Sequence, residues 1–250
     1  MNRNYDKWFM TRVKQCIKRY DMIPPQSHVV VGVSGGKDST ALLWIMAELQ
    51  KRSHLFFTLE AVHLSLGWGP VDVQPLVNLC RELEVPLHIK EFPVARIIKE
   101  KPEHNPCALC SKLRAGVLND MAVSLGAQCV ALGHHLDDVI ETYFLNLIFT
   151  GQMKTFMPNT RLSRKGLNLI RPLVYLPEQV VVRLGRQLGL PVLHNPCPYN
   201  GRTKREEMKD LVEDIVSRYP DFREMFLSAL ENVSLENLWK QKDNCYISNG

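Results

Sequence analysis

The sequence predicts an α/β protein with a doubly wound, mainly parallel sheet and a small helical C-terminal extension. Val29–Val33 is a short run of β-branched residues, which is typical of a strand buried on both faces. Strand-like and helix-like segments then alternate as far as residue 149. Such alternation is typical of right-handed crossovers on a parallel sheet. From 204 to 240 the pattern is helical, with a break at Pro220.

The expected elements follow one another without an internal repeat. An amphipathic N-terminal helix carries Trp8, Phe9, Val13 and Ile17 and ends near Pro24 and Pro25. Strands are expected at 29–33, 56–64, 87–92 and 129–132, with an edge strand at 167–170. Helices are expected at 40–50, 71–83, 109–125, 137–149 and 180–188. These elements divide the chain into an N-terminal helix (1–26), a core (27–200) and a helical tail (201–250).

The composition is that of an ordinary globular protein. Of the 250 residues, 45% are hydrophobic and 23% charged, and the formal net charge is +5. That charge suits a polyanionic partner, and it suits a surface excess of lysine equally well. No run approaches the about 20 apolar residues of a membrane span, and residues 1–19 lack the apolar centre of a signal peptide. We therefore expect a cytoplasmic protein with no membrane partner and with reduced cysteines.

The glycine-rich segment Ser34-Gly35-Gly36-Lys37-Asp38-Ser39 lies between the first buried strand and a helix. Glycines let the backbone approach an anion closely, and the N–H groups of a helix N-terminus attract phosphate. The Lys37 ammonium adds positive charge, and the Asp38 carboxylate suits Mg²⁺. The spacing fits neither the Walker nor the Rossmann pattern. A plain Gly-Gly turn is the alternative, but the strand–loop–helix context favours a phosphate site.

The cysteines fall into two groups. Cys107 and Cys110 form a C-x-x-C motif, which is compatible with a zinc half-site, a redox pair or part of an iron–sulfur site. The motif comes too late in the chain for a thioredoxin-like redox position. Cys197 lies in the proline-containing segment Asn195–Pro198 and is a candidate third thiolate. The other cysteines are expected in the core or in a polar tail, namely Cys16, Cys80, Cys129 and Cys245.

Three motifs, in this order, make the sequence resemble the TtcA family of tRNA 2-thiocytidine synthetases. They are the segment 34–39, which matches the PP-loop S-G-G-x-D-S, the C-x-x-C segment with Arg114, and Gly133-His134-His135-Leu136-Asp137-Asp138. Further matches include Ile170–Leu173 and Pro196-Cys197, so the resemblance covers nearly the whole chain. It implies the PP-loop ATP-pyrophosphatase fold, also described as adenine nucleotide α-hydrolase-like. It also implies ATP cleavage between the α- and β-phosphates.

The resemblance further implies a [4Fe-4S] cluster on Cys107, Cys110 and Cys197. Asn200 stands where family members often carry a fourth cysteine, which leaves three ligands and an open iron for an exogenous sulfide. ATP is expected on Ser34–Ser39, with adenine between the second strand and the fourth, near Ala61, His63, Gly133 and His134. Asp38 and Asp138 are expected to hold Mg²⁺, and Lys37 and Arg114 to balance phosphate charge.

Several of these residues also have structural interpretations. Asp137 and Asp138 open a helix, where acids favour the positive end of the dipole, and we assign capping to Asp137 and function to Asp138. Adjacent His134 and His135 at a strand end point apart and make poor zinc co-ligands. Arg114 lies one helical turn after Cys110, on the same face, which favours a role at the site over a solvated position.

The partners expected are tRNA, a cysteine desulfurase or other sulfide donor, and a second copy of the chain. Basic candidates for phosphate contacts are Arg161, Arg164, Lys165, Arg171, Arg202, Lys204 and Arg205. The apolar tail residues Phe222, Met225, Phe226 and Leu230 suit a homodimer interface. Rival interpretations are 2-thiouridine synthesis or another sulfurtransfer, a cluster-free PP-loop ligase of the lysidine type, a zinc-bearing relative and a nucleotide-binding module without catalysis.

Overall fold

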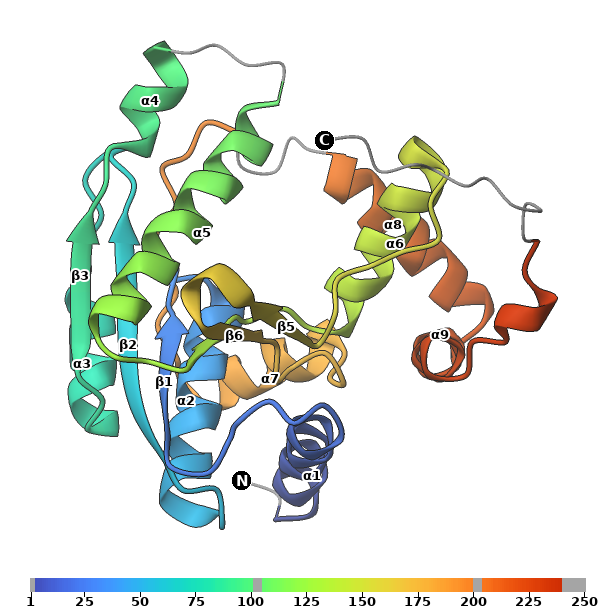
Figure 1. Cartoon of the computed structure of the whole chain (residues 1–250), viewed down its shortest axis with the longest axis horizontal. Helices are drawn as coiled ribbons and strands as arrows, with labels where there is room; N and C mark the ends of the chain where they lie inside the picture. The colour runs from blue at the N-terminus through green and yellow to red at the C-terminus, as the bar shows by residue number, and fades with distance from the viewer. Residues whose placement is uncertain (1–2, 101–104, 200–203, 240–250) are drawn as a thin grey trace.

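A six-stranded sheet with the strand order β3-β2-β1-β4-β6-β5 organises the chain (Figure 1). The computed structural model describes residues 3–100, 105–199 and 204–239. The strands are β1 (Ser27–Gly32), β2 (Phe57–Ser65), β3 (Leu87–Glu91), β4 (Cys129–Ala131), β5 (Asn159–Leu162) and β6 (Leu167–Ile170). All neighbouring strands are parallel except β5, which is antiparallel to β6. The doubly wound, mainly parallel sheet predicted from the sequence is confirmed.

Helices cover both faces of the sheet (Figure 1). They are α1 (Arg3–Arg19), α2 (Lys37–Arg52), α3 (Gln74–Leu83), α4 (Val94–Glu100), α5 (Pro106–Ser124), α6 (Leu136–Thr150), α7 (Glu178–Leu188), α8 (Lys204–Arg218) and α9 (Phe222–Glu231). Short 3₁₀ turns lie at Ser163–Lys165 and Leu235–Asn237. In the part of the chain that is described, no helix has the length and apolar character needed to cross a membrane.

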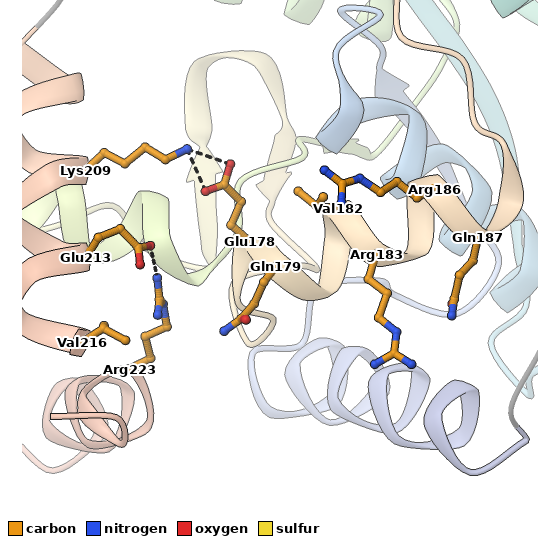
Figure 2. A pocket seen from close by; sticks show the side chains of 10 residues that line it. All are labelled: Glu178, Gln179, Val182, Arg183, Arg186, Gln187, Lys209, Glu213, Val216 and Arg223. Atoms are coloured by element: carbon orange, nitrogen blue, oxygen red, sulfur yellow. Dashed lines mark hydrogen bonds and ion pairs between the residues drawn. The ribbon is translucent and has the colours of Figure 1, made fainter. Parts of the chain in front are cut away.

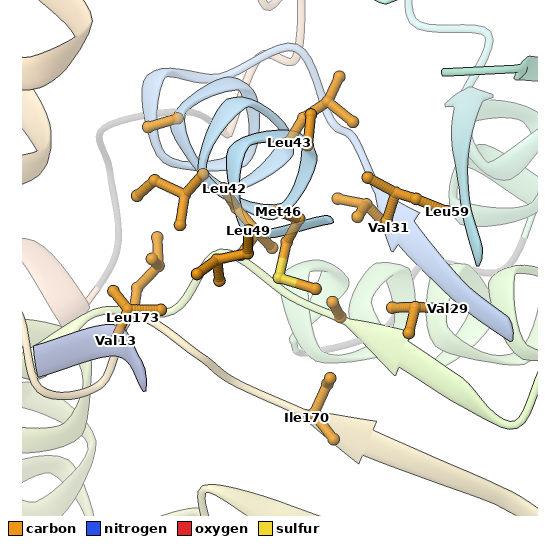
Figure 3. Packing of buried hydrophobic residues seen from close by; sticks show 14 of the residues in the cluster. Val13, Val29, Val31, Leu42, Leu43, Met46, Leu49, Leu59, Ile170 and Leu173 are labelled. Carbon is orange, nitrogen blue, oxygen red and sulfur yellow. The ribbon is translucent and has the colours of Figure 1, made fainter. Parts of the chain in front are cut away.

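The central strand β1 is buried on both faces, as its β-branched run predicts. Val29 and Val31 point into the larger core, where they meet the α2 side chains Leu42 and Met46 (Figure 3). Val30 points the other way, into a smaller cluster with Leu118 of α5. All six side chains are at most 8% exposed. The period-2 alternation of β1 therefore holds α2 on one face and α5 on the other.

Four details differ from the sequence-based expectations. Strand β6 is not an edge strand, because β5 pairs with its outer side through Arg161 and Asn168. Strand β5 and helix α4 were not expected at all; both are short. Helix α2 begins at Lys37 rather than Thr40, so the end of the glycine-rich segment forms its first turn. Helix α5 begins at Pro106 and therefore includes both cysteines of the C-x-x-C motif.

The apolar residues of the tail mostly pack within the chain. Phe222 and Phe226 of α9 lie against Phe144 of α6, with ring centroids 6.4 and 6.3 Å apart, and Leu230 packs against the main core. Met225, at 62% exposure, is the one of the four predicted interface residues that faces outward. Of the four residues predicted to form a dimer interface, three therefore already pack partly against α6 or the core of the same chain.

The strand order reverses between β1 and β4, since β2 and β3 lie on one side of β1 and β4, β6 and β5 on the other. Ligands of open α/β sheets bind at the carboxyl ends of the strands at such a switch point. The segments that follow β1 and β4 are Val33–Gly36 and Leu132–His135. These are the two segments in which the sequence places the nucleotide site.

Because β6 lies inside the sheet, we expect Ile170→Ala to lower the free energy of unfolding by about 2–5 kcal/mol. The Ile170 side chain is fully buried in the larger core, so its loss leaves a cavity. Ile89→Ala on the outer strand β3, where the side chain is 45% exposed, is the matched control and should cost much less. Urea denaturation measures both, and equal losses would contradict the interior position of β6.

Candidate active site

The glycine-rich segment turns directly from β1 into α2. Gly35 has φ +84°, a conformation open to glycine, and Gly36 is the N-cap of α2. The Ser34 and Ser39 hydroxyl oxygens lie 3.1 Å apart, and Ser39 Oγ donates to the Gly36 carbonyl at 2.9 Å. The N-terminal N–H groups of α2 are therefore presented at the switch point, in the geometry that binds phosphate.

Gly133, which follows β4, lies against the first turn of α2. A Cβ atom at Gly133 would be 2.9 Å from both the carbonyl carbon and the carbonyl oxygen of Asp38. These are backbone atoms, so they could not rotate away. Glycine at 133 is thus required for β4 and the glycine-rich segment to meet at this distance.

The Lys37 ammonium is held between two carboxylates. Its Nζ lies 2.8 Å from Asp38 Oδ2 and 2.9 Å from Glu178 Oε1. Burial opposes the charge on Lys37, but the two carboxylates outweigh burial and raise its pKa. Lys37 therefore stays protonated next to the phosphate-binding turn.

Glu178, the first residue of α7, connects that lysine to the C-terminal helices. Lys209 of α8 lies 2.9 Å from Glu178 Oε2 (Figure 2). Burial alone would raise the pKa of Glu178, but hydrogen bonds and charge from Lys37 and Lys209 outweigh burial and lower it to about 2. Glu178 also lines a groove of about 740 Å³ between α7, α8 and α9.

His135 separates the two aspartates predicted to hold Mg²⁺. Its Nε2 lies 3.7 Å from Asp38 Oδ1, and its Nδ1 lies 3.4 Å from Asp138 Oδ2. Asp138 completes a capping box with His135 at the start of α6, and its Oδ1 binds Arg205 Nη1 at 2.7 Å. Within the described residues, no group of three His, Cys, Asp or Glu side chains is arranged to hold a metal ion.

The capping role assigned to Asp137 needs correction. Asp138, not Asp137, caps α6 through the backbone N–H of His135. Asp137 is 2% exposed, binds Arg223 Nε at 2.6 Å and accepts the backbone N–H of Glu178 at 2.6 Å. Because it faces inward, it joins α6 to α7 and α9.

The residues expected around adenine lie near the same edge of the sheet. Ala61 and His63 are buried in β2, and His63 Nδ1 donates to the Val33 carbonyl at 2.8 Å. The His134 ring lies tilted against Phe156, with ring centroids 5.0 Å apart, and its buried Nδ1 has no hydrogen-bond partner. Burial is the largest influence on His134 and lowers its pKa to about 4, so the ring is neutral at physiological pH.

The three predicted cluster cysteines lie within electrostatic reach of one another, but in the described part of the chain they are not arranged as a metal-binding group. Cys107 and Cys110 lie in the first turns of α5, whose N-cap Asn105 accepts the Ala108 N–H. Burial raises the pKa of both thiols, and Cys197 raises both further through its charge. Arg114 opposes this at Cys110 by charge and by a hydrogen bond. Three thiols from two segments, beside one arginine, fit the donor chemistry of an iron–sulfur cluster.

The segment 189–199 carries Cys197 to the other two cysteines. Its Leu193 N–H donates to the Gly35 carbonyl at 2.8 Å, and a Cβ at Gly35 would lie 2.6 Å from Leu193 Cδ1. Farther along, Pro196 lies against Gly69, with 3.4 Å to an added Cβ. Tyr199 packs on Trp68 with ring centroids 5.8 Å apart. The segment thus contacts the glycine-rich turn and the β2–α3 connection before and after Cys197.

The basic residues proposed for RNA contact are not equivalent. Arg171 is 8% exposed and donates to the Met157 carbonyl, so its expected role in phosphate contact is wrong. Its guanidinium carbon lies 4.7 Å from the centroid of the Phe156 ring, so this cation packs against an aromatic ring inside the protein. Lys165 pairs with Asp120 and Arg205 with Asp138, whereas Arg164 is exposed. Arg202, Asn200 and Cys245 lie outside the described residues.

Sequence patterns did not identify the ionic partners of the site. Glu178, Lys209 and Arg223 come from three helices at the C-terminal side of the sheet, and each meets its partner only after folding. The only local signal was Pro177, which precedes a helix that begins with Glu178. A carboxylate at that position has an ordinary explanation in the helix dipole, so it did not stand out.

The fold and this edge of the sheet define a nucleotide-binding α/β protein with a phosphate-binding turn. A family model described as the PP-loop domain matches residues 6–212. The tRNA-cytidine(32) 2-sulfurtransferase of Pelobacter propionicus is 36% identical over 234 residues, which are 92% of this chain and 87% of that protein. The protein of the same name from Shewanella sediminis is 38% identical and covers 89% of this chain and 71% of its own length. The chain therefore belongs to the PP-loop family and, within it, to the proteins of that name.

Solved structures agree with this placement. The U34-tRNA thiolase NcsA of Methanococcus maripaludis, determined with its [4Fe-4S] cluster, superposes with a TM-score of 0.77. It is 25% identical, and the match covers 94% of this chain and 83% of NcsA. The NH3-dependent NAD synthetase of Campylobacter jejuni shares the fold, with a TM-score of 0.51, 16% identity and 74% coverage of each chain.

Gly133→Ala should weaken ATP binding at least about tenfold, because the methyl group displaces the first turn of α2. Gly185→Ala in α7 is the matched control, since nothing lies within 4 Å of an added Cβ there. That substitution should leave ATP affinity unchanged and stabilise the helix slightly. Isothermal titration with ATP measures both, and unchanged affinity for Gly133→Ala would show that the turn does not bind the nucleotide.

Glu178→Gln should destabilise the protein in a way that depends on pH. A carboxyl whose pKa falls from 4.5 to about 2 on folding stabilises the native state above the unfolded pKa, and this contribution disappears as pH falls towards 2. The loss on substitution should be about 1–2 kcal/mol near pH 6 after solvent screening. Urea denaturation of wild type and variant between about pH 6 and pH 3 tests it. A difference independent of pH, or one equal to that of the exposed Glu84→Gln, would contradict the prediction.

Proposed function

We propose that the chain is an ATP-dependent tRNA sulfurtransferase that replaces the 2-oxygen of an anticodon-loop cytidine with sulfur. The observation that supports this proposal is the contact of Leu193 with Gly35, which brings the segment that bears Cys197 to the phosphate-binding turn, with Cys107 and Cys110 within electrostatic reach of Cys197. The names of the relatives, tRNA-cytidine(32) 2-sulfurtransferase, support the same substrate.

The residues around the turn have proposed roles in activating the base. The N–H groups of Ser34–Ser39 bind the ATP phosphates, with adenine beside Ala61, His63, Gly133 and His134. Lys37 and Arg114 neutralise the charge that builds on the phosphates. The cytidine O2 attacks the α-phosphorus, the bond to the β-phosphate oxygen breaks, and pyrophosphate leaves. The 2-oxygen then departs with AMP when sulfide adds at the ring carbon.

Two metal centres are part of the proposal. Cys107, Cys110 and Cys197 would hold a [4Fe-4S] cluster, which when bound supplies an iron open to sulfide. Asp38 and Asp138 would hold Mg²⁺, a cation that prefers carboxylate oxygens. Since His135 lies between these two aspartates, its ring has to leave or the ion has to bind through water. A cysteine desulfurase or another donor supplies the sulfide, the protein works in the cytoplasm, and a homodimer is one expected assembly.

A second candidate substrate is the uridine at position 34 of tRNA. It is favoured by the structural similarity to NcsA, whose name describes a U34-tRNA thiolase. The activation chemistry is the same, because uridine also presents a 2-carbonyl oxygen. The two substrates differ only in the base that reaches the site.

Mass spectrometry of nucleosides from bulk tRNA tests the proposal. Deleting the gene should remove 2-thiocytidine, and re-expression should restore it only when Cys107, Cys110 and Cys197 are intact. Each Cys→Ser variant should also lose most of its bound iron, because the ligand set is incomplete. Cys80→Ala, in the core within α3, is the control and should restore the nucleoside.

Other outcomes separate the alternatives. Loss of a thiouridine with 2-thiocytidine intact would favour the second substrate. An iron-free protein that still releases pyrophosphate would indicate a PP-loop ligase, and bound zinc would indicate transfer from a persulfide. If no tRNA nucleoside changes, the proposed function is wrong.

A further inference from the structure

The end of α6 exposes an unusual amount of apolar surface. Ile148 and Phe149 are each 51% exposed, Met153 is 64% exposed and Met157 is 61% exposed. We call these four side chains the α6 tip. Single exposed apolar side chains are normal on a protein surface. A group of large ones marks a binding surface, so the α6 tip is a candidate binding surface.

The α6 tip is held in place by the fold. Gly151 ends α6 in the left-handed region with φ +64°, and the Asn146 amide donates to the carbonyls of Thr142 and Lys154. The Thr155 hydroxyl donates to the Val139 carbonyl at 2.9 Å. These bonds fasten residues 151–155 back onto α6, so the apolar side chains are presented on an ordered backbone.

The stretch of chain that carries the α6 tip is basic. From Thr142 to Pro177 the sequence contains Lys154, Arg161, Arg164, Lys165 and Arg171 and no aspartate or glutamate. Lys154 and Arg164 are exposed, and Lys204 of α8, which also pairs with Glu207, places its Nζ 5.6 Å from the Phe149 ring centroid. An exposed aromatic ring with cations beside it is the arrangement on which unpaired nucleotides stack.

The location of the α6 tip also matters. The C-terminal end of α6 and the N-terminal end of α5, which carries Cys107 and Cys110, both project beyond the carboxyl edge of the sheet (Figure 1). The glycine-rich turn lies at that same edge. A nucleic acid that brings one base to the turn and the thiols must therefore approach from the side on which the α6 tip stands.

From these observations we infer that the α6 tip binds unpaired loop nucleotides of the RNA substrate, with Phe149 as a stacking platform and Lys154 against phosphate. This inference rests on the proposed function and adds the surface that recognises its substrate. RNA fits better than a second copy of the chain. A two-fold contact through the α6 tip would set its cations against the same cations of the copy, whereas phosphates neutralise them.

The test measures binding of the full-length protein to an unmodified tRNA transcript with cytidine at position 32. Phe149→Ala should weaken binding about tenfold or more, because stacking on the ring is lost. It should leave binding to a blunt RNA duplex unchanged, since paired bases cannot stack on the ring. Phe56→Ala is the matched control: Phe56 is 73% exposed and lies before β2, at the opposite edge of the sheet. Lys154→Gln should weaken binding to both RNAs. It should also reduce the slope of the logarithm of the binding constant against the logarithm of the salt concentration by about one.

The outcomes distinguish this inference from the proposed function. If wild type binds the transcript and Phe149→Ala binds it equally well, the inference is wrong and the proposed function stands. It is also wrong if the variant weakens duplex binding to the same extent, or if it dissociates a dimer without changing RNA affinity. If wild type itself does not bind tRNA while it binds ATP, the proposed function fails first.

Discussion

The contact between Gly133 and the first turn of α2 is the constraint on which the site depends. Strands β1 and β4 are neighbours, and the segments that leave them must pass each other at the carboxyl edge. A Cβ atom added at position 133 would lie 2.9 Å from the backbone of Asp38. Only glycine therefore lets the two segments pass at this separation. The same contact brings His135 beside Asp38, so the position of α6 relative to the phosphate-binding turn follows from it. A side chain at 133 would move the nucleotide site and α6 apart together.

A second contact joins the segment that carries Cys197 to the glycine-rich turn. The Leu193 N–H donates a hydrogen bond to the Gly35 carbonyl, and the Leu193 side chain occupies the space that a side chain at position 35 would need. Cys197 follows four residues later, within a segment stiffened by Pro196 and Pro198. The reach of such a segment is short, since each residue spans at most about 3.6 Å. The third thiol is therefore held within a limited distance of the phosphate-binding turn.

The sequence predicted those parts of the fold and site that local patterns determine. The β-branched run at 29–33 and its glycine-rich continuation identify β1 and the turn, because burial on both faces and close anion approach each need particular residues. Residue type made Cys197 a candidate third thiolate, but its assignment to one cluster with Cys107 and Cys110 came from the family resemblance, since no local pattern encodes proximity across 87 residues. Strand β5 was missed because an edge strand can be polar and short. Glu178 and Asp137 were missed or misassigned because their partners lie on distant helices, and only tertiary packing decides which acid faces inward.

The distribution of acids and bases explains how the site can admit a polyanion. The carboxylates next to the turn do not face the substrate side unpaired: Asp38 and Glu178 bind Lys37, Glu178 also binds Lys209, and Asp138 binds Arg205. If phosphates bind at the turn as proposed, they would compete for the ammonium of Lys37 with Glu178, which has Lys209 as a second cation. Glu178 keeps Lys209 when Lys37 turns to a phosphate, and so the buried carboxylate is not left uncompensated, a state that is costly in a protein interior. The pairing of one carboxylate with two lysines thus lets Lys37 exchange partners while α7 and α8 stay joined.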